Sequence, residues 1–194
     1  MAADCTGHGV PGAFMSLIGM YLLHSIVKDA RVLSPELILT ELRWSIHHFL
    51  NQDTSESRDG MDLTVCLCDE EEIRVASAKS AFYYLRGGRL EMAKGDNLAV
   101  GGNRRILPHE TYSLLVLPKQ EVEYVFMCSD GYQDQFGGPD QKKYMRKRMM
   151  ELFERIGPLP AGQKQQALEE EFKEWKGSGP QIDDVLVLGF APNA

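Results

Sequence analysis

The chain has 194 residues, of which 43% are hydrophobic and 25% are charged, and its formal net charge is −7. These values are typical of one globular domain with a sizeable core. The negative charge argues against a protein that binds the phosphate backbone of nucleic acids, which would carry a basic stripe. We interpret the basic stretches 104–105 and 142–147 as solvated faces, and we expect no nucleic-acid partner.

The first predicted element is an apolar helix over residues 11–28, which opens at Pro11 after a glycine-rich turn. Proline suits the first helical position because its missing N–H would have no partner there. Apolar side chains cover more than one side of this helix, so we expect it to be largely buried. Glycines and polar residues interrupt the apolar run, which favours a core helix over a membrane span.

A second helix is predicted to begin at Pro35, with Ser34 as its N-cap. His47 and His48 lie near its end. Adjacent helical positions point in different directions, so they form a poor metal pair. We interpret these histidines as end-of-helix cations or surface residues.

Alternating and apolar segments then predict strands at 61–68, 73–78, 81–86, 89–93, 112–117 and 122–127. Two helices follow, over 143–156 with Met145 on its buried side, and over 163–176, which ends at Gly177 as a C-cap. The apolar segment 185–190 is expected to be a strand buried between layers. Antiparallel strands with helices grouped before and after them predict a layered α+β domain.

The four cysteines are predicted to be free thiols: Cys5, Cys66, Cys68 and Cys128. Cys66 and Cys68 share one face of a strand, and the chain has no Cys-x-x-Cys pair for zinc. Free thiols are typical of a reducing cytoplasm, so we expect a cytoplasmic location. No signal peptide is evident.

Three separated motifs place acidic side chains beside predicted buried elements. They are Asp-Cys-Thr-Gly-His-Gly-Val-Pro-Gly-Ala at 4–13, Cys-Ser-Asp-Gly-Tyr-Gln-Asp at 128–134 and Gln-Ile-Asp-Asp at 181–184. A buried carboxylate is costly unless it is paired or binds a cation. The motifs therefore suggest one cluster of hard oxygen ligands, suited to magnesium or manganese.

In this order, the three motifs resemble the SpoIIE-like bacterial branch of the PPM family, the metal-dependent serine/threonine phosphatases related to protein phosphatase 2C. The resemblance covers nearly the whole chain, as a single domain over residues 1–194. It implies an α/β/β/α sandwich of antiparallel sheets flanked by helices, with the metal site at one end between the sheets.

The resemblance also assigns ligands for two Mn²⁺ or Mg²⁺ ions. Asp4 matches the bridging ligand, the backbone carbonyl of Cys5 matches the ligand beside it, and Asp130 and Asp183 match the other acids. Such ions activate water to attack phosphorus, so no protein nucleophile is needed.

Three further residues are assigned weaker roles. Asp134 matches the acid of a third, weaker metal site, and Asp184 is expected to orient loops or water. His8 is a candidate proton donor to the leaving oxygen, although a turn residue bonded to backbone is the favoured interpretation.

The implied function is a protein serine/threonine phosphatase in bacterial signalling. By family analogy, the expected substrate of this phosphatase is a phosphorylated anti-sigma-factor antagonist. An upstream sensor domain is expected on the same, longer chain. If the full-length protein is anchored to a membrane, segments outside this one would supply the anchor, because this segment is expected to make no membrane contact. One alternative is a regulated docking module on a phosphatase fold with little turnover. Another is a metal-dependent nuclease or small phosphoesterase, and the low basic content counts against the nuclease.

Two further expectations concern the N-terminal part. The family begins with a Gly-Asp strand motif that supplies another metal ligand, whereas only 1–3 precede Asp4 here. We therefore expect a catalytic C-terminal portion that lacks the family's first strands. Its metal sites should be weak or empty and its activity low, and it should tend to form a homodimer through an exposed sheet edge. The helical pair over 11–50 either couples a sensor or dimer partner to the metal site or is a static core layer.

Overall fold

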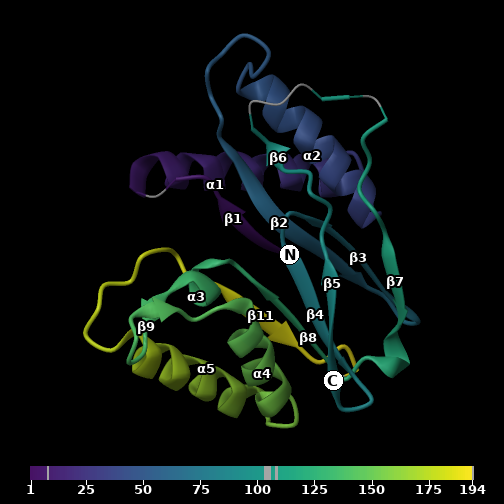
Figure 1. Cartoon of the computed structure of the whole chain (residues 1–194). Coiled ribbons are helices and arrows are strands. Elements are labelled where there is room, and N and C mark those ends of the chain that lie inside the picture. The colour runs from purple at the N-terminus through teal and green to yellow at the C-terminus, as the bar shows by residue number, and fades with distance from the viewer. Residues whose placement is uncertain (8, 103–105, 108, 194) are drawn as a thin grey trace. The chain divides into compact units, whose positions relative to one another are not determined.

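The computed structural model describes residues 1–7, 9–102, 106–107 and 109–193 (Figure 1). The chain divides into two compact units. The first comprises Met1–Ala81 and Lys94–Pro118, and the second comprises Phe82–Ala93 and Lys119–Ala194. Each unit has its own antiparallel sheet.

The sheet of the first unit has the strand order β1-β2-β3-β7, and β6 pairs with the beginning of β2. Its strands are β1 (Ala2–Cys5), β2 (Gly60–Cys68), β3 (Glu72–Ala78), β6 (Val100–Gly101) and β7 (Leu115–Pro118). The strand predicted at 112–117 therefore begins later than expected. The predictions for β2 and β3 are confirmed to within one residue.

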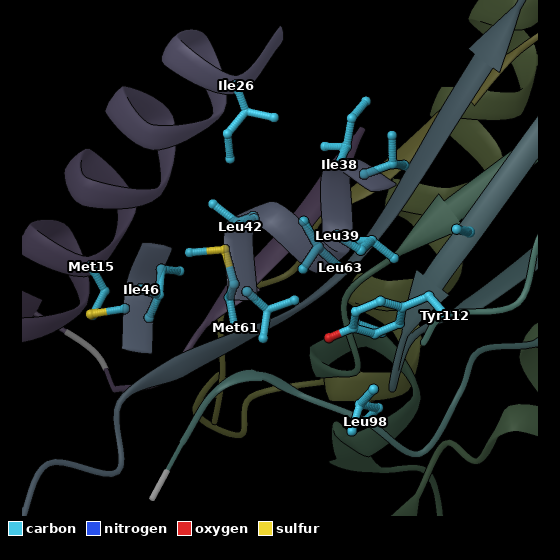
Figure 2. Packing of buried hydrophobic residues seen from close by; sticks show 14 residues of the cluster. Met15, Ile26, Ile38, Leu39, Leu42, Ile46, Met61, Leu63, Leu98 and Tyr112 are labelled. Carbon is cyan, nitrogen blue, oxygen red and sulfur yellow. The ribbon is translucent and has the colours of Figure 1, made fainter. Parts of the chain in front are cut away.

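The core of the first unit lies between this sheet and the helices α1 (Gly9–His24) and α2 (Pro35–Phe49). Figure 2 shows Leu39, Leu42 and Ile46 of α2 packed with Met61 and Leu63 of β2. The alternation in β2 explains this, because residues two apart point to the same face of a strand. The even-numbered positions of β2, including Asp62, therefore lie on the face away from this core.

Helix α1 is much more exposed than predicted. Only Gly12, Met15 and Gly19 of α1 are buried. Val10 and Tyr21 are each 70% exposed. Apolar side chains project from all sides of this helix, but neighbouring elements cover only one side of it. The apolar composition therefore predicted more burial than the structure has.

A π-helical turn (Ser25–Asp29) continues α1. The combined segment Gly9–Asp29 has 21 residues; its most apolar 18-residue window has a mean hydropathy of 1.6, and 22% of that window is buried. By length and composition alone the segment is long and apolar enough to cross a membrane, but core helices and signal sequences meet the same criterion.

Helix α2 begins at Pro35 as predicted, but Ser34 does not cap it through its side chain. The Ser34 hydroxyl donates instead to the Glu36 carboxylate, at 2.6 Å. His47 was interpreted as an end-of-helix cation or a surface residue; it lies in the last turn of α2 but is buried, with Nε2 3.0 Å from Asp53 Oδ1. Asp53 follows the end of the helix, so this contact depends on how the chain turns after α2.

The sheet of the second unit has the strand order β11-β8-β4-β5, with β4 (Ala81–Arg86), β5 (Arg89–Lys94), β8 (Tyr124–Cys128) and β11 (Val187–Phe190). A short 3₁₀ turn (Lys119–Glu121) precedes β8, and a two-stranded sheet pairs β9 (Phe136–Gly137) with β10 (Lys142–Lys143). The helices are α3 (Gly131–Asp134), α4 (Arg146–Ile156) and α5 (Ala161–Lys176). Gly177 caps α5 with φ 55°, as predicted.

Aromatic rings fix α4 on this sheet. Phe153 stacks on Phe126 with ring centroids 4.3 Å apart, and Tyr83 meets Phe153 edge-on at 5.4 Å. Met145 was predicted to be buried in this helix, but it precedes α4, has φ 75° and is 58% exposed.

Strand β11 was predicted to be buried between layers, and this is wrong. It is an edge strand, bonded to β8, and its side chains are only half-buried. Its continuous apolar run made it look like a central strand, but the run does not determine which strands lie beside it.

Candidate active site

The first acidic motif lies on β1, at the edge of the first sheet. Asp4 is directly opposite Asp62 of β2 in the antiparallel register, and Cys5 is opposite Met61. Two carboxylates that face each other across a strand pair repel unless positive charge or donors lie close to them. Asp62 was not predicted as a candidate site residue, although its place on the polar side of an alternating strand was a signal.

Thr6 fixes the end of β1 to the start of β2. Its N–H and its hydroxyl both donate to the Gly60 carbonyl, at 2.9 and 3.1 Å. The Gly60 N–H donates back to the Thr6 hydroxyl, at 3.2 Å. These three hydrogen bonds determine the path of the chain after Asp4 and Cys5.

The glycine-rich turn that follows has the backbone that its sequence predicts. Gly7 and Gly9 have φ values of 86° and 67°, which favour glycine. A Cβ on Gly12 would lie 2.5 Å from the Gly7 carbonyl oxygen, so the first turn of α1 packs closely on this turn. His8 lies outside the described residues, and its proposed proton transfer stays a prediction.

In the second unit, Ser129 joins the loops that carry the other two motifs. Its N–H donates to the Leu186 carbonyl at 3.0 Å, and its hydroxyl donates to the Asp184 carbonyl at 2.9 Å. The Leu186 N–H donates to the same hydroxyl at 2.9 Å. These three bonds, which we call the Ser129 clasp, bring Asp130 and Asp183 into adjacent loops at one end of the sheet.

Gly131 brings these loops still closer together. A Cβ at this position would lie 2.3 Å from the Asp184 carbonyl oxygen and 3.3 Å from Cβ of Asp183. Only a glycine after Asp130 therefore allows the two loops to approach this closely.

Gln135 is a second link between these loops, and it was not predicted from the sequence. Its side chain is buried and donates to the carbonyls of Phe136 and Pro180, at 3.0 and 2.9 Å. Its Oε1 accepts a bond from the Ile182 N–H at 3.4 Å. Gln135 thus connects α3 to the segment immediately before Asp183; its position one residue after Asp134 was the available signal.

The carboxylates of the second unit already have partners. Asp134 Oδ2 lies 2.8 Å from Lys143 Nζ, so a cation at Asp134 would have to share or displace this ammonium. Asp183 Oδ1 accepts the Asp184 N–H at 2.8 Å. Both Asp183 and Asp184 are exposed.

The acids have the right chemistry for the expected metal, because carboxylate oxygens suit Mn²⁺ and Mg²⁺. Among the residues that the structure describes, no group of three or more His, Cys, Asp or Glu side chains is assembled to hold an ion. The second unit thus contributes Asp130 and Asp183 as neighbouring donors, and the ligand roles of these acids, Asp4 and the Cys5 carbonyl stay predictions.

The four cysteines are free, as predicted. Burial raises the pKa of Cys66 to about 11 and that of Cys128 to about 12. Burial also raises the pKa of Cys5. A nucleophilic cysteine needs a lowered pKa, so these thiols are not activated.

Comparison with known families agrees with the motifs. The family model for stage II sporulation protein E (SpoIIE) matches residues 1–191. The chain belongs to the SpoIIE family. No curated protein sequence matches it.

Solved structures show that this SpoIIE family member has the fold of PP2C phosphatase domains. The SiaA-PP2C domain of Pseudomonas aeruginosa is similar with a TM-score of 0.82 at 23% identity, over 97% of this chain and 72% of that one. The PP2C phosphatase domain of SpoIIE from Bacillus subtilis, solved with a fragment of its regulatory domain, gives 0.68 at 15%, over 96% and 52%.

A third neighbour is the catalytic domain of the serine/threonine protein phosphatase PstP in complex with two manganese ions. It gives a TM-score of 0.62 at 18% identity, over 96% of this chain and 84% of that one. These likenesses confirm the predicted α+β class of antiparallel sheets and helices and the family resemblance.

Proposed function

We propose that this SpoIIE family member is a metal-dependent protein serine/threonine phosphatase, which hydrolyses phosphoserine or phosphothreonine on a partner protein. The observation that supports this most is the Ser129 clasp. It holds Asp130 and Asp183, which are 53 positions apart in the sequence, in adjacent loops. Two carboxylates fixed in this way suit binding of a divalent cation.

Asp4, the Cys5 carbonyl, Asp130 and Asp183 would hold two Mn²⁺ or Mg²⁺ ions, and Asp134 would hold a third, weaker one. Bound ions supply an activated water at neutral pH and offset negative charge on a phosphoryl group. PstP, a structural neighbour, binds two manganese ions. Manganese is therefore the metal to test first.

The remaining residues of the site have positioning roles in this proposal. Ser129 and Gln135 hold the loops of Asp130 and Asp183, and Thr6 holds the strand end of Asp4. The neutral Cys128 thiol, with its pKa raised to about 12 by burial, takes no part as a nucleophile. His8 would protonate the leaving oxygen or remain a turn residue.

In the cell, the proposed substrate is a phosphorylated anti-sigma-factor antagonist in the cytoplasm. The chain would be one phosphatase domain, the catalytic C-terminal part of a longer protein with an upstream sensor domain. The helices α1 and α2 would transmit the sensor signal or contact a second copy. The exposed apolar side chains of α1 support such a contact.

The test is release of phosphate from a phosphoserine peptide, with and without manganese. Asp130→Asn should abolish metal-dependent release and leave the circular dichroism spectrum unchanged. Asp140→Asn is the matched control, because Asp140 is exposed and pairs only with Lys142 among the described residues. It should keep wild-type activity.

Two outcomes would contradict the proposal. Peptide binding without phosphate release at any manganese concentration would indicate a docking module. Faster cleavage of an oligonucleotide than of the phosphopeptide would indicate a nuclease.

A further inference from the structure

Basic side chains are concentrated around the start of α4, although the whole chain is acidic. Five of the seven residues 142–148 are Lys or Arg and none is Asp or Glu. Arg155 follows on the same helix. We call the six side chains the α4 basic face: Lys142, Lys143, Arg146, Lys147, Arg148 and Arg155.

These side chains point to solvent because the opposite side of α4 is in the core. Met149, Leu152 and Phe153 are each at most 2% exposed. All six members of the α4 basic face are exposed, and the side chains of Lys142 and Lys147 are 75% and 89% exposed. The face is therefore accessible to a partner.

The α4 basic face is fastened to the segment that carries Asp130 and Asp134. The N–H groups of Tyr144 and Met145 donate to the carbonyls of Gln135 and Gln133, at 2.9 and 2.8 Å. Lys143 pairs with Asp134, and Arg146 Nε donates to Gln133 Oε1 at 3.3 Å. All of these contacts lie within the second unit, so the face has a fixed position beside these acids.

Lys142, Lys143 and Arg155 each pair with a carboxylate, whereas the positive charge of the other three members is not neutralised by a close carboxylate among the described residues. Arg148 stacks over the ring of Trp175, 4.4 Å from the centroid, and the polar partner of Arg146 is the neutral Gln133. Among the described residues, neither arginine is paired with a carboxylate. Lys147 lies 3.9 Å from Glu151, which is a long contact in solvent and contributes little. The helix dipole also disfavours cations at this end, so these residues do not stabilise α4.

We propose that the α4 basic face docks an acidic segment of the phosphoprotein substrate, next to the phosphorylated residue. This inference rests on the proposed function and adds the class of substrate to it: phosphoserine or phosphothreonine flanked by Asp or Glu. Complementary charge increases the rate of encounter and fixes the register of a bound chain.

A polypeptide suits this face better than a nucleic acid or an anionic membrane. Carboxylates lie among the basic groups, namely Asp134, Asp140, Glu151 and Glu171. They would repel a continuous row of phosphates. Exposed apolar groups, Phe136 at 45% and Met145 at 58%, lie beside the lysines and suit contacts with side chains.

The face has the size of a short peptide. Arg148 and Arg155 are seven positions apart, or two turns, and so lie on the same side of α4; this is about 10 Å along a helix and about three residues of extended chain. A hollow of about 390 Å³ lies along this length, lined by residues that include Tyr144, Lys147, Arg148 and Arg155. Glu171 holds Arg155 in place at 2.6 Å.

The binding test uses the whole chain and two fluorescent peptides without phosphate. One carries four consecutive glutamates, and the other carries glutamines instead. Fluorescence anisotropy at low salt should show about tenfold tighter binding of the glutamate peptide, and this preference should fall as salt screens the charges. The double variant K142E/K147E should lose the preference, while the matched double reversal R89E/K94E on β5, where both residues are exposed, should keep it.

The activity test separates docking from catalysis. K142E/K147E should turn over p-nitrophenyl phosphate at the wild-type rate, but its KM for a glutamate-flanked phosphoserine peptide should rise about tenfold. If no substrate is turned over by the wild type, the proposed phosphatase activity fails and the anisotropy still decides the docking proposal.

Three results would overturn the docking proposal. The first is equal affinity of the wild type for the two peptides. The second is an equal loss of preference in R89E/K94E and K142E/K147E. The third is tighter binding of duplex DNA or phosphatidylserine vesicles than of the glutamate peptide at about 150 mM salt, which would assign the face to a polyanion.

Discussion

Gln135 offers a direct test of how the candidate site is held together. Replacing it with leucine removes two good hydrogen bonds, to the carbonyls of Pro180 and Phe136 at 2.9 and 3.0 Å, and a longer one from the Ile182 N–H at 3.4 Å. These three partner residues are exposed, so water can solvate their backbone groups. The cost is then the net value of the lost bonds, about 1 kcal/mol each for the two good ones.

We therefore expect Gln135→Leu to lower the free energy of unfolding by about 2–3 kcal/mol, because the third bond is weak. For a chain of this size that corresponds to a fall in Tm of about 4–12 °C. The segment before Asp183 also loses its anchor, so manganese affinity should fall about 10- to 100-fold. Thermal melts followed by circular dichroism and manganese titration calorimetry measure the two effects.

The matched control is Gln166→Leu. Gln166 is exposed on α5 and bonds only to Glu170 one turn later, at 2.7 Å, among the described residues. Such a pair contributes at most about 0.5 kcal/mol, so its Tm and manganese affinity should stay close to the wild type. If Gln135→Leu melted within about 1 °C of the wild type and bound manganese equally well, the role of Gln135 as a link between the two acidic loops would be refuted.

Two further predictions concern close packing and pH. Gly131→Ala should destabilise the protein by about 1–3 kcal/mol and lower phosphatase activity, because its Cβ would lie 2.3 Å from the Asp184 carbonyl oxygen. The control is Gly162→Ala, whose Cβ would have no atom within 4 Å. Urea titrations should show that this control does not destabilise the protein. Burial raises the pKa of Cys66 to about 11 and that of Cys128 to about 12, so the unfolded chain loses these protons first as pH rises. The neutral thiols contribute their full stability below about pH 8.5. Between about pH 8.5 and pH 12 the free energy of unfolding should fall by up to about 1.4 kcal/mol per pH unit for each thiol. Urea midpoints at pH 8 and pH 10.5 check this, and no fall, or a rise, with pH would contradict it.

Local patterns in the sequence were sufficient to predict most elements of the fold. Alternation over 61–68 determined both the extent of β2 and the side that packs on Leu39 and Leu42. Pro35 and Gly177 marked helix ends because one has a fixed φ and the other tolerates φ 55°. These signals depend on a few adjacent residues, so a single sequence contains them in full.

Burial was harder to predict, because it depends on what lies beside an element. Helix α1 and strand β11 are both apolar on all sides, which indicates that they are able to be buried. Yet Tyr21 is 70% exposed and β11 is an edge strand. His47 shows the opposite error, because its partner Asp53 lies beyond the helix end. In each case the neighbour, which the pattern does not specify, determines the result.

The same distinction applies to the candidate site. Asp130 and Asp183 were singled out because they adjoin apolar strands, and Asp4 because it precedes a glycine-rich turn and a helix. The bonds that hold the loops of Asp130 and Asp183 join segments far apart in the chain, such as Ser129 with Asp184. The clasp has a consequence for register. Strand β11 pairs with β8 over only Val187 to Phe190, and a slip of one residue would turn each of its side chains to the other face. Because Ser129 bonds to both Asp184 and Leu186, it resists that slip at the end nearest Asp183. The position of Asp183 relative to Asp130 therefore depends on a serine hydroxyl as much as on the two carboxylates themselves.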